Sequence, residues 1–215
     1  MDLYAAEIYR LQEKHDFVPL SILARRMDVS LQAASAMVKR LMRSKLVTQR
    51  AYKGVRLTRQ GEHVGKLALR RHRIIEVYLT RVMGFGWDEV HELTDHLHLG
   101  VDQAVEDRMD EHAGHPTRCP HGEPIPSREG VMPILNDASL VAMQPGAKLR
   151  ISRVRANEPE KLRYFADLKL WPGTPIELVS ISPFNGPLKI LVNQGEHVLG
   201  YDLAANLWVE PADET

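Results

Sequence analysis

Four prolines close together divide this 215-residue chain near its middle. They stand at positions 116, 120, 124 and 126, within the segment HPTRCPHGEPIP. Proline fixes its own φ and pushes the preceding residue towards an extended conformation, so this segment cannot continue a helix. Apolar residues recur at helical spacing before it, and from about Leu140 onward they alternate as in strands. The chain is therefore expected to fold as several units, helical first and mainly β afterwards.

Basic residues gather at the start of the chain. Residues 1–71 contain 15 Lys and Arg against 6 Asp and Glu, a formal charge of +9, while the remainder carries −9 and the whole chain is neutral. Such an asymmetry indicates that the basic end meets a polyanion, and a solvated basic surface is the simpler alternative.

The pattern within residues 1–71 predicts a winged helix-turn-helix DNA-binding domain. Apolar spacing predicts a short helix over 5–14, a second from Pro19 to a polar turn at 28–30, and a third over 31–45. The next stretch, LVTQRAYKGVRLT, is typical of two short strands about a turn. A plain helical bundle with a hairpin is the alternative, but helix, turn, helix and basic hairpin in this order favour the DNA reader.

The third helix has two distinct faces. Its inward stripe is predicted to be Leu31, Ala34, Met37, Val38 and Leu41. The outer face has small and amide side chains near its start, which can approach base edges, and cations further along, which can pair with phosphates. Together with the N-cap of this helix and the hairpin cations, the predicted DNA-binding residues are Ser30, Gln32, Ala33, Ser35, Ala36, Lys39, Arg40, Arg43, Arg50, Lys53 and Arg56.

Residues 72–126 are predicted to form a compact helical unit that can hold a metal ion. Thr58 is expected to cap a long helix that Gly84 closes, and two further helices follow over 87–100 and 101–114. Histidines and carboxylates share helical faces here: His72 with Glu76, and His91 with Asp95 and His98. Taken singly, each histidine is more often a surface or core residue, but two facing helices could close around Mn(II), Fe(II), Zn(II) or Co(II).

Residues 127–139 are expected to be a linker, and residues 140–215 a small β domain with one inserted helix at EPEKLRYFADL. No apolar run is long enough for a membrane helix, and the N-terminus is unlike a secretory signal. The single cysteine, Cys119, excludes an internal disulfide. Cys119 and His121 superficially resemble part of a zinc site, but no second pair at suitable spacing completes it. A cytoplasmic protein without membrane contact is predicted.

Several segments carry a family resemblance: AEIYRLQEK, LVTQRAYKGVRLTRQGEHVGKLALRRHRIIEVYLTRVMGFGWDEVHEL, VEDRM and CPHGEPIP. With them the sequence resembles the diphtheria-toxin-repressor family of metal-dependent transcriptional repressors, which includes iron-dependent regulators and manganese transport regulators. The likeness covers essentially the whole chain. It implies a mainly α fold with a small β domain: a winged helix-turn-helix, a helical dimerisation and metal-binding domain, and an SH3-like C-terminal domain related to ferrous iron transport proteins.

The resemblance also implies metal ligands. The family's ancillary site falls on His72, Glu76, His91 and Glu158, while its amide ligand falls near Lys161, which departs from the pattern and leaves Glu160 as a substitute. The primary site is matched less completely. Its positions fall on Asp95, His98 and Leu99, and on Leu3 beside Asp2. Leucine cannot bind a metal, so either Asp95 and His98 hold an ion together with Asp2, or the two sites have merged. Cys119 and His121 are structural in this scheme.

The function implied is that of a homodimer that binds palindromic double-stranded DNA operators when loaded with Mn2+ or Fe2+, and represses genes for metal uptake. Zn2+ or Co2+ can substitute, and the protein is not expected to be an enzyme. Two alternatives stay open. One is a metal-dependent hydrolase that uses the His and Asp cluster; the other is a DNA-binding regulator without metal control, for which Leu99 is the main argument.

Overall fold

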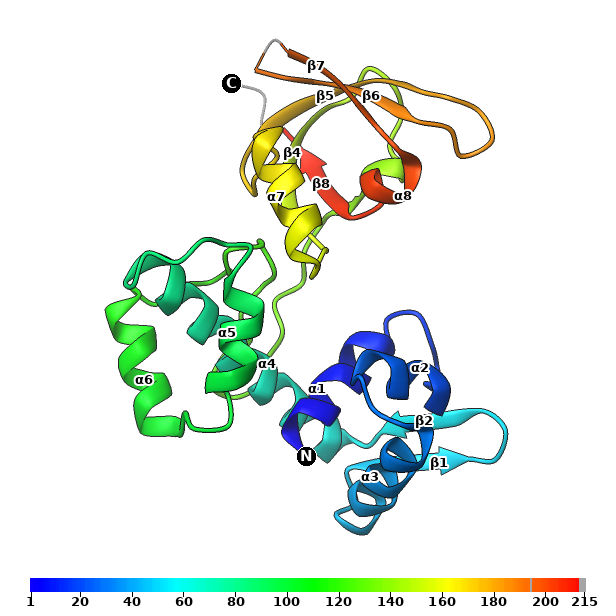
Figure 1. Ribbon diagram of the computed structural model, residues 1–215, viewed down its shortest axis with the longest axis vertical. Coiled ribbons are helices and arrows are strands. Elements are labelled where there is room, and N and C mark those ends of the chain that lie inside the picture. Colours follow the sequence, from blue (N-terminus) through cyan, green and yellow to red (C-terminus); the bar gives the residue numbers. More distant parts are fainter. Residues whose placement is uncertain (194, 213–215) are drawn as a thin grey trace. The chain divides into compact units, whose positions relative to one another are not determined.

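The computed structural model describes residues 1–193 and 195–212 (Figure 1). By its internal contacts the chain divides into two compact units. The first comprises Met1–His72 with Ile125–Pro133, and the second Arg73–Pro124 with Ile134–Thr215. Among the described residues, no helix combines the length and apolar character needed to cross a bilayer.

The first unit contains the predicted winged helix-turn-helix. Helices α1 (Asp2–Leu11), α2 (Leu20–Arg26) and α3 (Leu31–Arg43) precede a hairpin of β1 (Val47–Arg50) and β2 (Gly54–Leu57). The hairpin is antiparallel, and a two-way backbone bridge between Val18 and Val55 adds the segment before α2 to its edge. Gly54 permits this approach, because a Cβ at that position would lie 2.1 Å from the Val18 carbonyl oxygen.

Local signals at the start of α3 behave as expected, with one exception. Ser30 caps the helix, since its side chain accepts a hydrogen bond from the Ala33 amide at 3.1 Å. Ala34, Val38 and Leu41 are buried on the inward stripe. Leu31 was predicted on the same stripe but is 56% exposed. The prediction for Leu31 is wrong because the first helical residue lies beyond the part of α3 that packs on the core.

A long helix and two short ones follow. Helix α4 (Arg59–Arg81) begins after Thr58, whose hydroxyl accepts the Gly61 amide at 3.1 Å and so confirms the predicted cap. In the second unit, α5 (Val90–Leu97) and α6 (Gln103–His112) follow it, and Asp102 caps α6. Apolar residues of the second unit bury one another there: Ile75, Leu79, Val90 and Val101. Their helical spacing is why these segments form helices that pack.

The C-terminal part of the second unit is a six-stranded sheet in the order β3-β8-β4-β5-β6-β7. All neighbouring strands are antiparallel. The strands are β3 (Ala138–Ser139), β4 (Lys148–Val154), β5 (Pro175–Ile181), β6 (Leu188–Val192), β7 (Gly195–Leu199) and β8 (Leu207–Pro211). The predicted inserted helix is α7 (Pro159–Asp167), and a 3-10 turn η1 (Leu140–Ala142) and α8 (Tyr201–Ala204) complete the domain. Alternate strand residues and the inner face of α7, including Leu162 and Phe165, build one apolar core. The predicted fold class, mainly α with a small β domain, is confirmed.

Candidate metal centre

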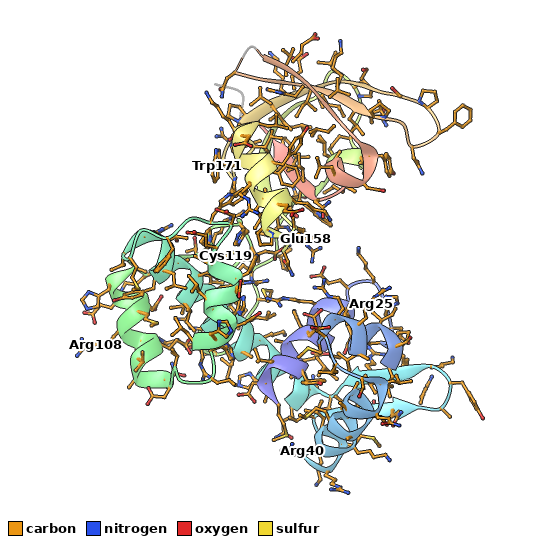
Figure 2. The ribbon with its side chains drawn as sticks, viewed as in Figure 1. Arg25, Arg40, Arg108, Cys119, Glu158 and Trp171 are labelled. Atoms are coloured by element: carbon orange, nitrogen blue, oxygen red, sulfur yellow. The ribbon has the colours of Figure 1, made fainter. Side chains whose placement is uncertain are left out.

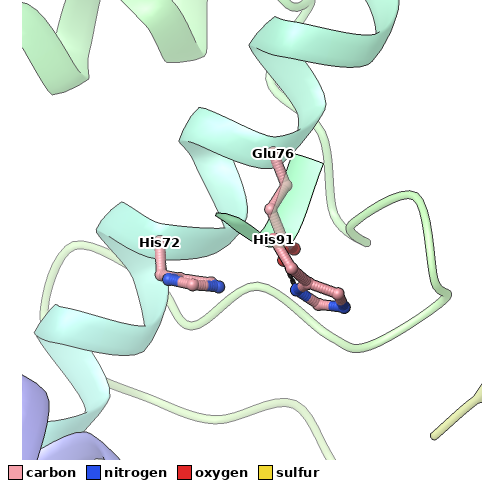
Figure 3. A group of neighbouring side chains, drawn as sticks. All are labelled: His72, Glu76 and His91. Atoms are coloured by element: carbon pink, nitrogen blue, oxygen red, sulfur yellow. Dashed lines mark ion pairs between the residues drawn. The ribbon is translucent and has the colours of Figure 1, made fainter. Parts of the chain in front are cut away.

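Three side chains of the predicted ligand set come together. His72 and Glu76 lie one turn apart on α4, and His91 projects from the start of α5 (Figure 3). The Nδ1 atom of His91 lies 2.8 Å from Oε1 of Glu76. One donor atom from each of the three residues lies within 4.8 Å of the others. Glu76 is only 1% exposed, so this arrangement places a carboxylate in the interior with imidazoles as neighbours.

Glu76 also belongs to a second group, formed with Cys119 and His121. The three donor atoms again lie within 4.8 Å of one another, and all three residues are buried. His121 Nδ1 is 3.9 Å from Glu76 Oε2 and 3.9 Å from Cys119 Sγ. The two oxygens of one carboxylate therefore face two different donor sets.

The orientation of the His121 ring is fixed by its neighbours. Its Nε2 donates to the Trp87 carbonyl oxygen at 2.8 Å, so Nδ1 is the nitrogen turned towards Glu76 and Cys119. The ring stacks on His91, with centroids 4.3 Å apart and planes 11° from parallel, and on Trp87 at 5.4 Å. A ligating histidine commonly donates its other ring N–H to a backbone carbonyl in this way, since that bond holds the ring in place.

Burial and charge change the proton affinities of this second group. Burial opposes a charged imidazole, but the hydrogen bond with Cys119 and the nearby Glu76 carboxylate raise the pKa of His121 to about 10. Burial, followed by the Glu76 charge, raises the pKa of the Cys119 thiol. Without a metal, a proton on His121 thus balances the charge of Glu76. A divalent cation would replace that proton and favour the thiolate.

The donor chemistry fits a divalent transition metal. A buried carboxylate needs a compensating charge, and imidazole with carboxylate suits Mn(II), Fe(II), Zn(II) and Co(II). The thiol of the second group adds a softer donor, which suits Fe(II), Zn(II) and Co(II) more than Mn(II).

Other predicted ligands do not join either group. Asp2 is an exposed residue at the start of α1 in the first unit, whereas Asp95 is exposed on α5 and His98 is buried at its C-terminal end. Glu158 lies at the N-cap of α7 (Figure 2), and its carboxylate pairs with Lys161 at 2.9 Å. That hydrogen bond lowers the pKa of Glu158. Lys161, which stands at the family's amide position, thus forms an ion pair with Glu158 in this structure.

Cys119 and His121 are the candidate ligands that the sequence interpretation left out. Their spacing alone supplied two donors and no third, so a structural role was the simpler interpretation. The third donor, Glu76, comes from a helix far earlier in the chain. The available signal was a cysteine two residues before a histidine, and only the folded structure shows that Glu76 lies beside them.

The predicted DNA-binding residues lie mainly at the surface of the first unit. Most of the predicted residues on α3 are exposed, and Ser35 is half-buried. The hairpin cations Arg50, Lys53 and Arg56 are also exposed. Arg56 pairs with Asp16 at 2.8 Å, and the Arg50 guanidinium lies over the Phe17 ring at 5.0 Å. These contacts hold Arg50 and Arg56 near the body of the domain.

Comparison with known families gives matches along most of the chain. Residues 1–55 match the iron dependent repressor N-terminal DNA binding domain, and residues 58–127 match the iron dependent repressor metal binding and dimerisation domain. A solved manganese-dependent transcriptional repressor in complex with manganese is 30% identical, with a TM-score of 0.92 over 98% of this chain and 99% of that one. The chain belongs to the iron-dependent repressor family. Residues 138–211 match the FeoA domain, which agrees with the SH3-like domain expected for the C-terminal part.

The names of other similar proteins mention different ions. The iron-dependent repressor IdeR of Mycobacterium tuberculosis is 30% identical over 146 residues, which span 66% of this chain and 64% of that protein. Solved structures of ScaR with bound Cd2+ and with bound Zn2+ are each 25% identical, with TM-scores of 0.85 and 0.84. Iron, manganese, zinc and cadmium thus all occur among these similar proteins, so similarity does not assign the ion.

Proposed function

We propose that this chain is a metal-dependent transcriptional repressor that binds a palindromic operator as a homodimer and represses genes for manganese or iron uptake. The observation that carries the proposal is the buried carboxylate of Glu76 beside His72 and His91, in a chain whose first domain belongs to a DNA-binding family. The first structural comparison, with a manganese-dependent repressor over almost its whole length, supports this function.

The DNA-reading chemistry would reside on the outer face of α3. Gln32, Ala33 and Ala36 are exposed near its N-terminal end, where an amide and small methyl groups suit base edges in the major groove. Lys39, Arg40 and Arg43 are exposed further along, where they suit phosphates. In a two-fold dimer, two such helices read half-sites one helical turn of DNA apart, which is why a palindrome is expected.

The ion would be held first by His72, Glu76 and His91, with Cys119 and His121 as the second group on the same carboxylate. A bound Mn2+ or Fe2+ would supply bonds that join these ligands, and Zn2+ or Co2+ can take the same donors. Asp2, Asp95, His98 and Glu158 remain proposed ligands of the DNA-competent state, in which their side chains would have to move towards an ion.

Exposed apolar side chains on the metal-binding domain support dimerisation. Six large ones lie on or beside its helices, with exposed fractions from 37% to 83%: Val82, Met83, Phe85, Leu97, Leu99 and Val105. Such side chains favour a protein interface over solvent. Leu99, which cannot be a ligand, has a role as an interface residue in this scheme.

Metal control requires a difference in affinity between two states. The ion can shift the protein towards DNA binding only if it binds the DNA-competent state more tightly, and the same factor then raises its own affinity when DNA is bound. The matched domains are named for DNA binding, metal binding and dimerisation, and so favour this mechanism over the hydrolase. The intact trio of His72, Glu76 and His91 favours it over a regulator without metal control.

The test is a DNA titration. Random DNA selected with the Mn(II)-loaded protein supplies an operator, and anisotropy gives its dissociation constant with Mn(II), with anaerobic Fe(II) and with chelator. We expect the metal to tighten binding by about 5- to 150-fold, the usual range of allosteric coupling. Glu76→Gln should remove this response, while Glu92→Gln, an exposed carboxylate on α5, should keep it. Equal affinity with metal and chelator in the wild type would exclude metal control.

A further inference from the structure

Glu123, in the CPHGEPIP segment, contacts three arginines from two different parts of the second unit. We propose that Glu123 is a positioning residue for the metal centre: it fastens the turn that carries Cys119 and His121 both to helix α4, which carries Glu76, and to strand β4 of the C-terminal domain. This role rests on the proposed function. In this arrangement β4 belongs to the framework of the metal centre even without an ion.

The first connection runs to helix α4. Arg73 Nη2 lies 3.1 Å from Glu123 Oε2, and Arg73 Nη1 donates to the Pro124 carbonyl oxygen. Arg73 is one turn before Glu76 on α4, and its side chain is only 7% exposed. The planar guanidinium therefore bonds to the turn at the Glu123 carboxylate and at the Pro124 carbonyl, and so fixes the distance between the turn and the helix that carries Glu76.

The second connection runs to the end of strand β4 and the residue that follows it. Arg153 Nη1 lies 3.2 Å from Glu123 Oε2, and Arg155 Nε lies 3.1 Å from Oε1. Both guanidiniums also lie over the Trp208 ring of β8, at 4.5 and 5.2 Å from its centroid. Arg153 makes further bonds to Asp137, at 2.9 and 3.0 Å. The arginines are thus held in place by the C-terminal domain, and Glu123 attaches the turn to them.

Backbone contacts place the turn against an irregularity in β4. The register of β4 against β8 shifts between Ile151 and Arg153, which leaves Ser152 as an extra residue. Arg118 donates to the carbonyl and hydroxyl oxygens of Ser152 at 3.2 and 3.0 Å. The Val154 amide donates to the His121 carbonyl oxygen at 2.8 Å. His121 is therefore bonded to β4 through its own backbone, one residue before Gly122 and two before Glu123.

The charge of Glu123 matters more than its volume. Guanidinium nitrogens of three arginines lie 3.1 to 3.2 Å from the Glu123 carboxylate, which therefore supplies the negative charge between them. A neutral amide of the same shape would leave three mostly buried cations close together, with the negative charge of Asp137 remaining beside Arg153. Removing one partner of a buried ion pair leaves uncompensated charge, and the turn should loosen from both of its supports.

The experiment compares Glu123→Gln, Glu123→Asp and Glu196→Gln in the full chain. Glu196 pairs with Lys189 at the surface of the same domain and serves as the matched control. Three quantities are measured: Mn(II) affinity by calorimetry, the thiolate-to-metal charge-transfer band after Co(II) loading, and hydrogen exchange of the Val154 amide in the metal-free protein. Glu123→Asp keeps the charge and guards against a variant that fails to fold.

The His121 ring, which the turn carries, stacks on His91 of the first donor group. We therefore expect Glu123→Gln to weaken Mn(II) binding by about 10- to 100-fold, the usual effect of losing a residue that orients metal ligands. The Co(II)–thiolate band should fall and Val154 exchange should accelerate, with partial recovery in Glu123→Asp and no change in Glu196→Gln. A Glu123→Gln protein with wild-type affinity, band and exchange would overturn the inference alone. A wild type that binds neither ion would overturn the proposed function, and this role of Glu123 with it.

Discussion

Gly122 lies so close to Ser152 that a Cβ at position 122 would stand 2.2 Å from the Ser152 carbonyl oxygen. The φ of Gly122 is +85°, a region that side chains rarely adopt. Both constraints act at the point where the turn carrying His121 meets β4.

Gly122→Ala should therefore destabilise the protein by about 2 kcal/mol or more, because backbone strain and a backbone clash add. Urea unfolding measures the difference. Gly100→Ala is the control, since its Cβ would meet only the Leu97 carbonyl oxygen, at 3.7 Å. Equal stability of the two variants would show that the turn can shift away from β4 at little cost.

The two donor groups predict different effects of His72→Ala and Cys119→Ser. If the ion is held by His72, Glu76 and His91, His72→Ala should weaken Mn(II) binding by about 100-fold, which follows from the loss of a direct ligand where even an outer residue costs 10- to 100-fold. Cys119→Ser should leave that affinity nearly unchanged and remove the Co(II)–thiolate band. Calorimetry and absorption spectra measure both. If Cys119→Ser weakened Mn(II) binding more than His72→Ala did, the first ion would instead be assigned to the Cys119 group.

Burial opposes the charge of Glu123, but the three neighbouring arginines outweigh burial and lower its pKa, which predicts an acid-sensitive contribution to stability. A carboxylate whose pKa is lower in the folded state contributes fully above its unfolded pKa, near 4.5, and loses this contribution as the pH falls further. The free energy of unfolding of the metal-free wild type should thus decline more steeply below pH 4.5 than that of Glu123→Gln. Urea titrations across that range measure both slopes, and parallel curves would contradict the prediction.

Cations on α3 predict the salt dependence of DNA binding. Replacing Lys39 or Arg40 with alanine should weaken binding to all sequences similarly and reduce the slope of log affinity against log salt by about 0.9 for each lost phosphate contact. Gln32→Ala should instead change which operators are preferred. Arg108→Ala, at an exposed arginine on α6, is the control. An unaltered slope in both the Lys39 and the Arg40 variants would remove α3 from the DNA interface.

Features set by neighbours in the sequence could be predicted, and those set by distant segments could not. Ser30 and Thr58 are caps because each bonds to an amide three residues later, a relation that the sequence itself displays. Leu31 has the spacing of a core residue, but the extent of the core beneath α3 decides its exposure. Cys119 meets Glu76 through tertiary packing, and no local pattern encodes that meeting.

For the same reason, the ligands of the first donor group could be predicted from the sequence, and the residues that support them could not. His72 and Glu76 share a helical face by their spacing, and His91 followed from the family resemblance together with helical periodicity. Glu123 carried no signal as a positioning residue, because its three arginines come from α4, from β4 and from the residue just after β4, on either side of it in the chain.

The carboxylate of Glu76 is shared by both donor groups, one oxygen towards His91 and the other towards His121. Two ions could not bind to this carboxylate independently, because the first ion would draw electron density from the oxygen that the second ion requires. Their binding constants would be linked reciprocally, whatever the sign. A titration curve for this protein should then depart from a simple hyperbola whenever both groups fill, and its shape would report on a single side chain.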